Sequence, residues 1–285
     1  MQLQYFRPDD LDTAIEWLTD NAASIAAGCT DLLAGTTAQR LPGPVLDLTG
    51  IGVLRGISRT AEGWRFGATT TWSDVIGAEL PPAFDSLKMA AREVGSIQIQ
   101  NAATLAGNLV NASPAADGVP CWLTLDAEVE LQSTTGTRRM AIGDFITGPR
   151  HTALQRGEIV TAIHVPKDAA NGVSSFLKLG ARKYLVISIA MVAVRLVIDD
   201  GHFTAAAISV GSCSAVALRL ASAEAFLAGK PATAETLAAI PDAMLTEGLQ
   251  PIDDLRSNAD YRQDAAGELV RRCLAVIANA GADVP

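Results

Sequence analysis

Apolar residues near the start of the chain recur with helical spacing. Asp9 and Asp10 precede apolar positions 11, 14, 15 and 18. Acids placed ahead of an i, i+3/i+4 pattern predict an amphipathic helix with a capped start. A short apolar strand follows at 25–27 and runs into a turn of small and polar residues, 28–31. The N-terminal segment is therefore expected to mix helix and strand.

A glycine-rich stretch at 50–56 follows a strand at 45–48 and imitates a dinucleotide fingerprint. That fingerprint requires a helix directly after the glycines. The residues that follow alternate between polar and apolar and are rich in Thr and aromatics, which predicts a hairpin. We therefore exclude a Rossmann unit.

The middle of the chain, about 56–168, alternates between stretches with helical spacing of apolar residues and stretches with the two-residue alternation of strands. Ser73 and Asp74 are expected to cap a helix over 75–80, and Pro82 opens a longer helix that Gly95 ends. An apolar stretch predicts a buried helix at 120–125. A hairpin over 127–132 and 138–142 and a strand over 158–166 complete the segment.

The last segment carries strands first and helices afterwards. Strands are predicted at 174–179, 188–198 and 203–210, the last two joined by an Asp-Asp-Gly turn. Helical patterns cover 215–227, 233–240 and 261–280. This order predicts an α+β domain in which helices cover one face of a three-stranded antiparallel sheet.

Composition narrows the function classes. The 285 residues are 49% hydrophobic and 19% charged, as in a globular protein, and the net charge of −9 argues against a nucleic-acid partner. No apolar run reaches the ~18–20 residues of a membrane span, and the start lacks an export pattern, so we expect a cytoplasmic protein. The four cysteines and three histidines are scattered, so no metal ligands are expected in this chain.

Two stretches suggest ligand binding. Residues 95–117 carry six hydrogen-bonding side chains among Ala and Gly, which would let a backbone approach a flat ligand and satisfy its polar edge. The alternative is a set of turns that joins two strands. The turn at 28–31 could present consecutive N–H groups to a phosphate, although ordinary turns share its composition.

A family resemblance rests on these two stretches. The run QIQNAATLAGN at 98–108, followed by ASPAAD at 112–117, resembles the flavin-contacting segment of the FAD-binding (medium) subunits of molybdenum hydroxylases. This group includes the xanthine, carbon monoxide and nicotinate dehydrogenases. The turn at 27–32 resembles the family's pyrophosphate-binding A-G-G-T-D-L. Gln100, Ala106 and Cys29 depart from the family pattern, and Cys29 would be strained if it adopts φ > 0 in place of a glycine.

The resemblance implies a fold and a cofactor site. The fold is α+β, with a two-part FAD-binding domain of PCMH type at 1–168 (subdomains about 1–55 and 56–168) and a C-terminal domain at 172–285. The pyrophosphate of FAD would lie against the turn formed by Ala27, Gly28, Cys29, Thr30, Asp31 and Leu32. The ribityl chain and the phosphates would lie along Thr104, Gly107, Asn108 and Asp117. Val160 and Lys178 would lie near the isoalloxazine ring.

The implied function is electron transfer. FAD in this chain would receive electrons from [2Fe–2S] clusters of a small subunit, fed by a molybdenum cofactor in a large subunit, within a dimer of heterotrimers. No side chain here need act as acid, base or nucleophile, and His164 is expected to be structural. We expect Asp117→Ala to lower FAD occupancy without disturbing the fold. Two alternatives stay open: a stand-alone flavin oxidoreductase related to the muramate dehydrogenases, and a scaffold subunit that has lost FAD.

Overall fold

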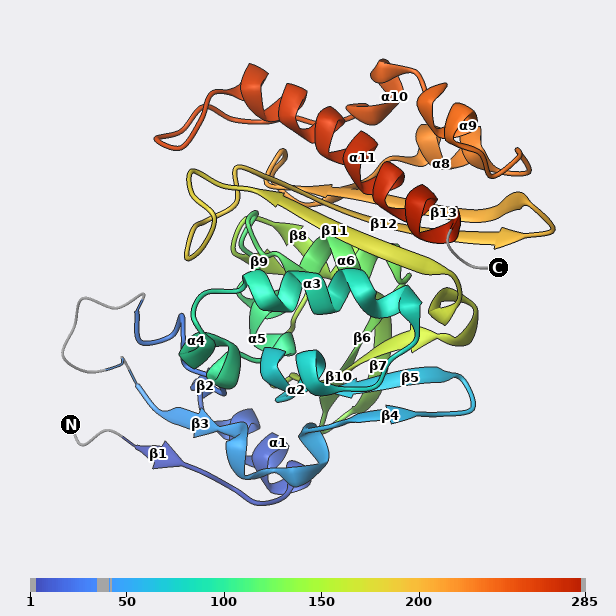
Figure 1. Ribbon diagram of the computed structural model, residues 1–285. Coiled ribbons are helices and arrows are strands. Elements are labelled where there is room, and N and C mark those ends of the chain that lie inside the picture. Colours follow the sequence, from blue (N-terminus) through green and yellow to red (C-terminus); the bar gives the residue numbers. More distant parts are fainter. Residues whose placement is uncertain (1–3, 35–40, 42, 283–285) are drawn as a thin grey trace.

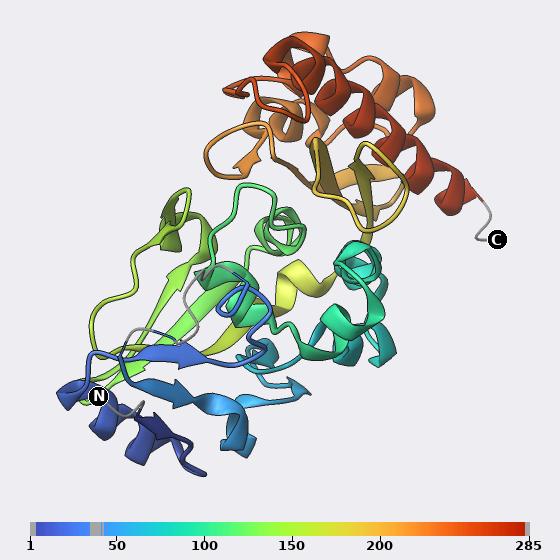
Figure 2. The ribbon, with the colours of Figure 1, turned by 90° about the vertical axis from the view of Figure 1, so that its left-hand side faces the viewer.

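The computed structural model describes residues 4–34, 41 and 43–282 (Figure 1). A small parallel sheet lies at the N-terminal end, a five-stranded antiparallel sheet with helices fills the middle, and a four-stranded antiparallel sheet under helices ends the chain. Figure 2 shows the C-terminal part, in orange and red, as a separate layer above the rest.

The first sheet has the order β1 (Tyr5–Phe6), β3 (Val45–Asp47), β2 (Ser24–Ala26), all parallel. Helix α1 (Leu11–Asp20) covers it, and Asp10 caps the helix by accepting a 2.8 Å hydrogen bond from the Thr13 amide. Both the helix and its cap confirm the prediction. Residues 48–54 form two 3-10 turns, η1 (Leu48–Gly50) and η2 (Gly52–Leu54), and a hairpin follows, so the glycines open no Rossmann helix.

The second sheet has the order β4 (Ile57–Arg59), β5 (Gly63–Gly67), β10 (Ile159–Pro166), β6 (Glu128–Ser133), β7 (Gly136–Ala141). All its neighbours are antiparallel, and the predicted hairpin forms as β6–β7. Helix α7 (Ile142–Phe145) leads into a minor hairpin, β8 (Ile146–Gly148) and β9 (His151–Thr152).

Helices pack over this sheet: α2 (Trp72–Gly77), η3 (Pro82–Phe84) with α3 (Asp85–Glu93), α4 (Ile97–Ala102), α5 (Leu105–Val110) and α6 (Gly118–Thr124). The predicted cap of α2 is wrong by two residues. Thr71 is the N-cap and forms a capping box with Asp74, which places Asp74 at the third helical position. The 95–117 stretch is largely helical, because Ser96 and Thr104 cap two short helices.

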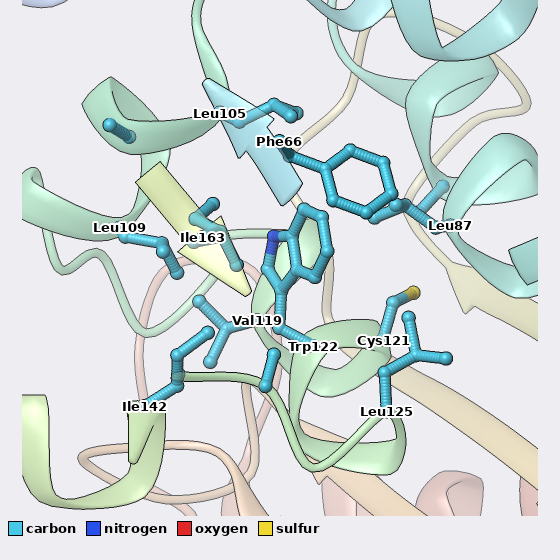
Figure 3. Packing of buried hydrophobic residues seen from close by; sticks show 14 of the residues in the cluster. Phe66, Leu87, Leu105, Leu109, Val119, Cys121, Trp122, Leu125, Ile142 and Ile163 are labelled. Atoms are coloured by element: carbon cyan, nitrogen blue, oxygen red, sulfur yellow. The ribbon is translucent and has the colours of Figure 1, made fainter. Parts of the chain in front are cut away.

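The largest hydrophobic core lies between the second sheet, helices α3 and α6, and the underside of the third sheet. Trp122, on α6, meets the ring of Phe66 edge-on with ring centroids 5.2 Å apart, and Leu109 and Ile163 pack nearby (Figure 3). The predicted buried helix at 120–125 is therefore confirmed.

The third sheet has the order β11 (Val173–Leu179), β12 (Ala190–Asp199), β13 (His202–Gly211), β14 (Leu218–Arg219), after the short turn η4 (Lys167–Ala170). The three predicted strands are present, and β14 adds a short fourth. Because 218–219 pair with Ser209 and Val210, the helix expected from 215 begins only at α8 (Ala221–Leu227). Helices α9 (Ala234–Ala238), α10 (Asp242–Leu245) and α11 (Ala259–Ala282) complete the cover of the outer face.

Candidate functional site

A cavity of about 490 Å³ lies where the turn after β2, helices α4 and α5, and strand β10 meet. Three groups of residues line it. Positions 25 and 27–32 come from β2 and its turn, 99, 103, 104, 106–108, 110 and 111 from α4, α5 and their flanks, and 154, 159 and 160 from β10 and the segment before it. Leu48, Ala68, Thr69, Trp72 and Val94 complete the wall.

Gly28 allows the turn at 27–32 to pack closely against the junction of α4 and α5. A Cβ on Gly28 would lie 2.1 Å from the carbonyl oxygen of Ala102 and 2.8 Å from Cα of Ala103. Residues 27–32 therefore pack directly on the α4–α5 junction, an approach that only glycine permits. The structure brings together two stretches that lie more than 70 positions apart in the sequence.

Cys29 adopts φ = 56° at the tip of this turn. This is the left-handed conformation, in which a residue with a side chain is strained, as expected for Cys29 in place of a glycine. Burial, assisted by the nearby Asp47 carboxylate, raises the pKa of the Cys29 thiol, so the thiol stays protonated at neutral pH. Its Sγ lies 3.6 Å from the carbonyl oxygen of Ala27.

The turn offers consecutive backbone donors to the cavity. Within the described part of the chain, no group accepts a hydrogen bond from the amides of Cys29, Thr30 or Asp31. All three residues line the cavity. Successive unpaired N–H groups in a tight turn form a concave site that attracts anions.

Helix α5 supplies the opposite wall. Thr104 caps the helix by accepting a 3.1 Å hydrogen bond from the Gly107 amide, and a Cβ on Gly107 would lie 2.8 Å from the same Thr104 oxygen. Oδ1 of Asn108 is buried and has no partner among the described residues, and Nε1 of Trp72 is in the same state. An unpaired buried polar atom costs about 1–3 kcal/mol. Because both atoms are also closed to solvent from the side of the cavity, this cost belongs to the packing of the wall and not to a ligand contact.

Two of the twelve expected residues lie outside the cavity lining. Lys178 Nζ forms a 2.7 Å ion pair with Asp117 Oδ2, and the two side chains are only 6% and 7% exposed. The hydroxyl of Ser188 donates to the other oxygen of Asp117 at 2.5 Å. Burial raises the pKa of the Asp117 carboxyl, while Lys178 and Ser188 act in the opposite direction.

This buried pair lies close to one wall of the cavity. Lys178 Nζ is 3.5 Å from the carbonyl oxygen of Glu93, and the next residue, Val94, lines the cavity. Ser188 could not be predicted from the sequence, because no local pattern shows that a serine 71 positions away meets Asp117. Trp72 was not predicted either, although the small polar run 69–71 before it resembles the other two lining stretches.

The remaining expected residue, Val160, lines the cavity at a bulge in β10, where the register with β6 shifts. His164, on the same strand, lies outside the cavity. Its Nε2 is 2.9 Å from Glu130 Oε2. The structure therefore places ten of the twelve residues around one cavity, and Asp117 and Lys178 in a buried pair beside it.

Two family models match the chain in tandem. Residues 1–168 match the FAD binding domain in molybdopterin dehydrogenase, and residues 175–277 match the CO dehydrogenase flavoprotein C-terminal domain. The nicotinate dehydrogenase FAD-subunit of Eubacterium barkeri is 35% identical over 83% of each chain. The nicotine 6-hydroxylase medium subunit of Paenarthrobacter nicotinovorans is 31% identical over 95% of this chain and 96% of its own.

Solved structures agree with the sequence comparisons. In a structure of reconstituted CO dehydrogenase from Oligotropha carboxidovorans, one chain superposes with a TM-score of 0.89 at 27% identity, covering 98% of both chains. Fold and cavity thus define an α+β FAD-binding protein. The chain belongs to the family of FAD-binding subunits of molybdenum hydroxylases. Its relatives are medium subunits and FAD subunits of oxidoreductase complexes.

Two further observations concern the described residues only. No helix among them is both long and apolar enough to cross a bilayer, and no three side chains of His, Cys, Asp or Glu gather as metal ligands would. In the family, the molybdenum cofactor and the iron–sulfur clusters belong to partner subunits.

Proposed function

We propose that this chain holds FAD in the cavity between the β2 turn and α5, and that it passes electrons from a [2Fe–2S] partner subunit to an external acceptor. The proposal includes a large molybdenum subunit, a dimer of heterotrimers and a cytoplasmic location, where four free thiols are normal. Bound FAD would supply the ability to take up electrons singly and release them in pairs. The observation that carries the proposal is the convergence of two low-bulk stretches on one cavity.

The residues around the cavity fit the chemistry of FAD. The amides of Cys29, Thr30 and Asp31, which have no acceptor among the described residues, would hold the pyrophosphate, which needs several donors close together. The Asn108 side chain, which lines the cavity, would meet a ribityl hydroxyl, and Gly107 beside it adds no side chain to the same wall. Val160 offers a buried apolar surface for the isoalloxazine ring.

The Asp117–Lys178 pair would act at the ring end of the cavity. Lys178 holds a cation there, and Asp117 offsets most of its charge at 2.7 Å. The net field at the ring is then small, so either partner, removed alone, would change the local charge by a full unit in a buried setting. The role of this chain is to bind the cofactor, exclude water and fix that field; no side chain need transfer a proton.

Binding is tested on the full chain with Asn108→Ala. We expect FAD affinity to fall about tenfold, as for a lost hydrogen bond to a buried group. Asn101→Ala is the matched control: Asn101 lies on α4 outside the lining and accepts from Ser73 Oγ. Equal affinity in the two variants would remove Asn108 from the site, and a wild-type chain that takes up no FAD would favour the scaffold alternative.

Electron transfer is tested on the complex purified with its natural partners. Substrate added without oxygen should bleach the flavin absorbance after the iron–sulfur bands, and an added acceptor should restore it. A flavoprotein that purifies alone and turns over without partners would instead support the stand-alone alternative.

A further inference from the structure

An exposed guanidinium lies beside the cavity. Arg150 is at the tip of the β8–β9 hairpin, and its Nη1 donates to both the carbonyl oxygen and the side-chain Oδ1 of Asn111, which lines the cavity. The Arg150 amide also donates to the carbonyl oxygen of Ala112 at 2.8 Å. The hairpin, labelled β8 and β9 in Figure 1, is thereby fastened to the C-terminal end of α5.

The backbone of Arg150 is strained. Its φ is 64°, and it follows Pro149, so the pair resembles the central positions of a type II turn. Glycine or asparagine normally takes the second of these positions, and a larger side chain there costs about 1–2 kcal/mol. Strain of this kind gathers at binding sites, where a particular side chain is needed.

Arg150 has no ion-pair partner in the part of the chain that the structure describes. Its side-chain hydrogen bonds within the described residues go only to Asn111, which is neutral. The loop 149–157 also carries Arg156 and His151 and contains no acid, in a chain whose net charge is −9. An overall negative protein repels anions, so a local cation group at a cavity edge would decide whether an anionic molecule reaches it.

The same edge is apolar next to the cation. Val110, which is 37% exposed and precedes Asn111 in the chain, lines the cavity together with Asn111, and so does Leu154. An apolar surface beside a cation suits a molecule that carries a flat organic part and a negatively charged group.

We propose that Arg150 recognises an anionic electron acceptor at the edge formed by Val110, Asn111 and Leu154. This inference rests on the proposed function. The reduced cofactor would lose two electrons, the acceptor would gain them, and Arg150 would only bind and orient the acceptor. A neutral quinone or oxygen would gain nothing from this cation.

Two inorganic probes of opposite charge test the proposal. The full chain, loaded with FAD and reduced by dithionite, is reoxidised by hexacyanoferrate(III) or by hexaammineruthenium(III), with two ions of either probe consumed for each reduced cofactor. In Arg150→Gln, which keeps a donor for Asn111 but loses the charge, we expect the second-order rate constant for the anion to fall about five- to tenfold. The rate constant for the cation should stay the same or rise, and Arg150→Lys should restore the wild-type ratio.

Arg156→Gln is the matched control, because it removes an equal charge from an exposed position of the same loop. We expect it to change the rate constant for the anion less than twofold. If Arg150→Gln and Arg156→Gln lower the rate constant for the anion equally, the effect comes from the net charge of the protein and the proposal is overturned. An equal change in the rate constants for the anion and the cation in Arg150→Gln would overturn it as well.

A second readout needs no cofactor. Hexacyanoferrate(II) binding to the FAD-free chain, followed by calorimetry, should weaken in Arg150→Gln and persist in Arg156→Gln. This measurement separates the two proposals: a chain that fails to bind FAD yet binds the anion through Arg150 contradicts only the proposed function. Unchanged anion binding in Arg150→Gln contradicts only the inference.

Discussion

Lys178 on β11 and Asp117 at the start of α6 form a buried ion pair, 2.7 Å from Nζ to Oδ2, that joins the C-terminal sheet to the FAD-binding part of the chain. Ser188, which precedes β12, adds a hydrogen bond to the same carboxylate. The pair lies beside the wall of the cavity and connects this region to a separate sheet. Under the proposed function, the stability of the domain contact and the field at the cofactor would therefore depend on the same two side chains.

The buried pair changes the expected result of Asp117→Ala. The sequence alone predicts a lower FAD occupancy with the fold intact. Because the variant would leave the Lys178 ammonium buried without an anion, we now expect a loss of about 3–5 kcal/mol in the free energy of unfolding as well. Urea unfolding of Asp117→Ala, Lys178→Met and the double variant measures this coupling. Strictly additive losses would mean that the two side chains do not stabilise each other.

Gly28→Ala should weaken both the fold and FAD binding. The new methyl group would meet the Ala102 carbonyl oxygen at 2.1 Å, and backbone cannot move aside as a flexible side chain can. We expect a loss of about 1–3 kcal/mol in urea unfolding and a lower FAD affinity. Gly52→Ala is the control, since nothing lies within 4 Å of a Cβ at that position. Equal stability of the two variants would show that the turn does not pack on the α4–α5 junction.

Cys29→Gly should stabilise the protein slightly. The substitution removes a left-handed penalty of about 1–2 kcal/mol but adds about 0.5–1 kcal/mol of backbone entropy in the unfolded chain. The expected net gain is therefore at most about 1 kcal/mol, with FAD affinity equal or higher. Cys29→Ser keeps the strain and nearly the same size, so it should match the wild type. A destabilised Cys29→Gly would show that the thiol makes a contact worth more than the strain.

Glu130 should give the protein an acid-sensitive stability. The hydrogen bond to His164 and further contacts with Thr161 and Arg65 lower the pKa of the Glu130 carboxyl to about 2. A lowered pKa means that the folded state favours the ionised form. The stabilisation is complete above the unfolded pKa of about 4.3 and is lost as the pH falls toward 2.

Glu130→Gln tests this pH dependence. We expect the free energy of unfolding of the wild type to be about 1–2 kcal/mol higher than that of the variant at pH 5, after allowance for solvent screening. This difference should shrink toward pH 2. Chemical unfolding at several pH values measures it. Glu79→Gln, an exposed position, should show no such trend. A difference that stays constant between pH 5 and pH 2 would contradict the assignment.

Local sequence patterns determined much of the fold. The apolar period of α1, the hairpins β6–β7 and β12–β13, and the buried helix α6 all follow from neighbours within a few residues, so the sequence predicts them. The exclusion of a Rossmann unit rested on the same local logic. The stretch 27–32 and the stretch 98–117 carried the family resemblance because small residues and amides are informative wherever a backbone must approach a ligand.

Tertiary structure decided what depends on distant residues. The cap of α2 moved to Thr71 because a capping box with Asp74 competes with Ser73, and β14 formed because a partner strand reached it. The pairing of Asp117 with Lys178 and Ser188, and of Arg150 with Asn111, spans 39 to 71 positions. No periodicity encodes such contacts, because they arise only when separate elements pack and a buried charge or an exposed donor finds the nearest partner.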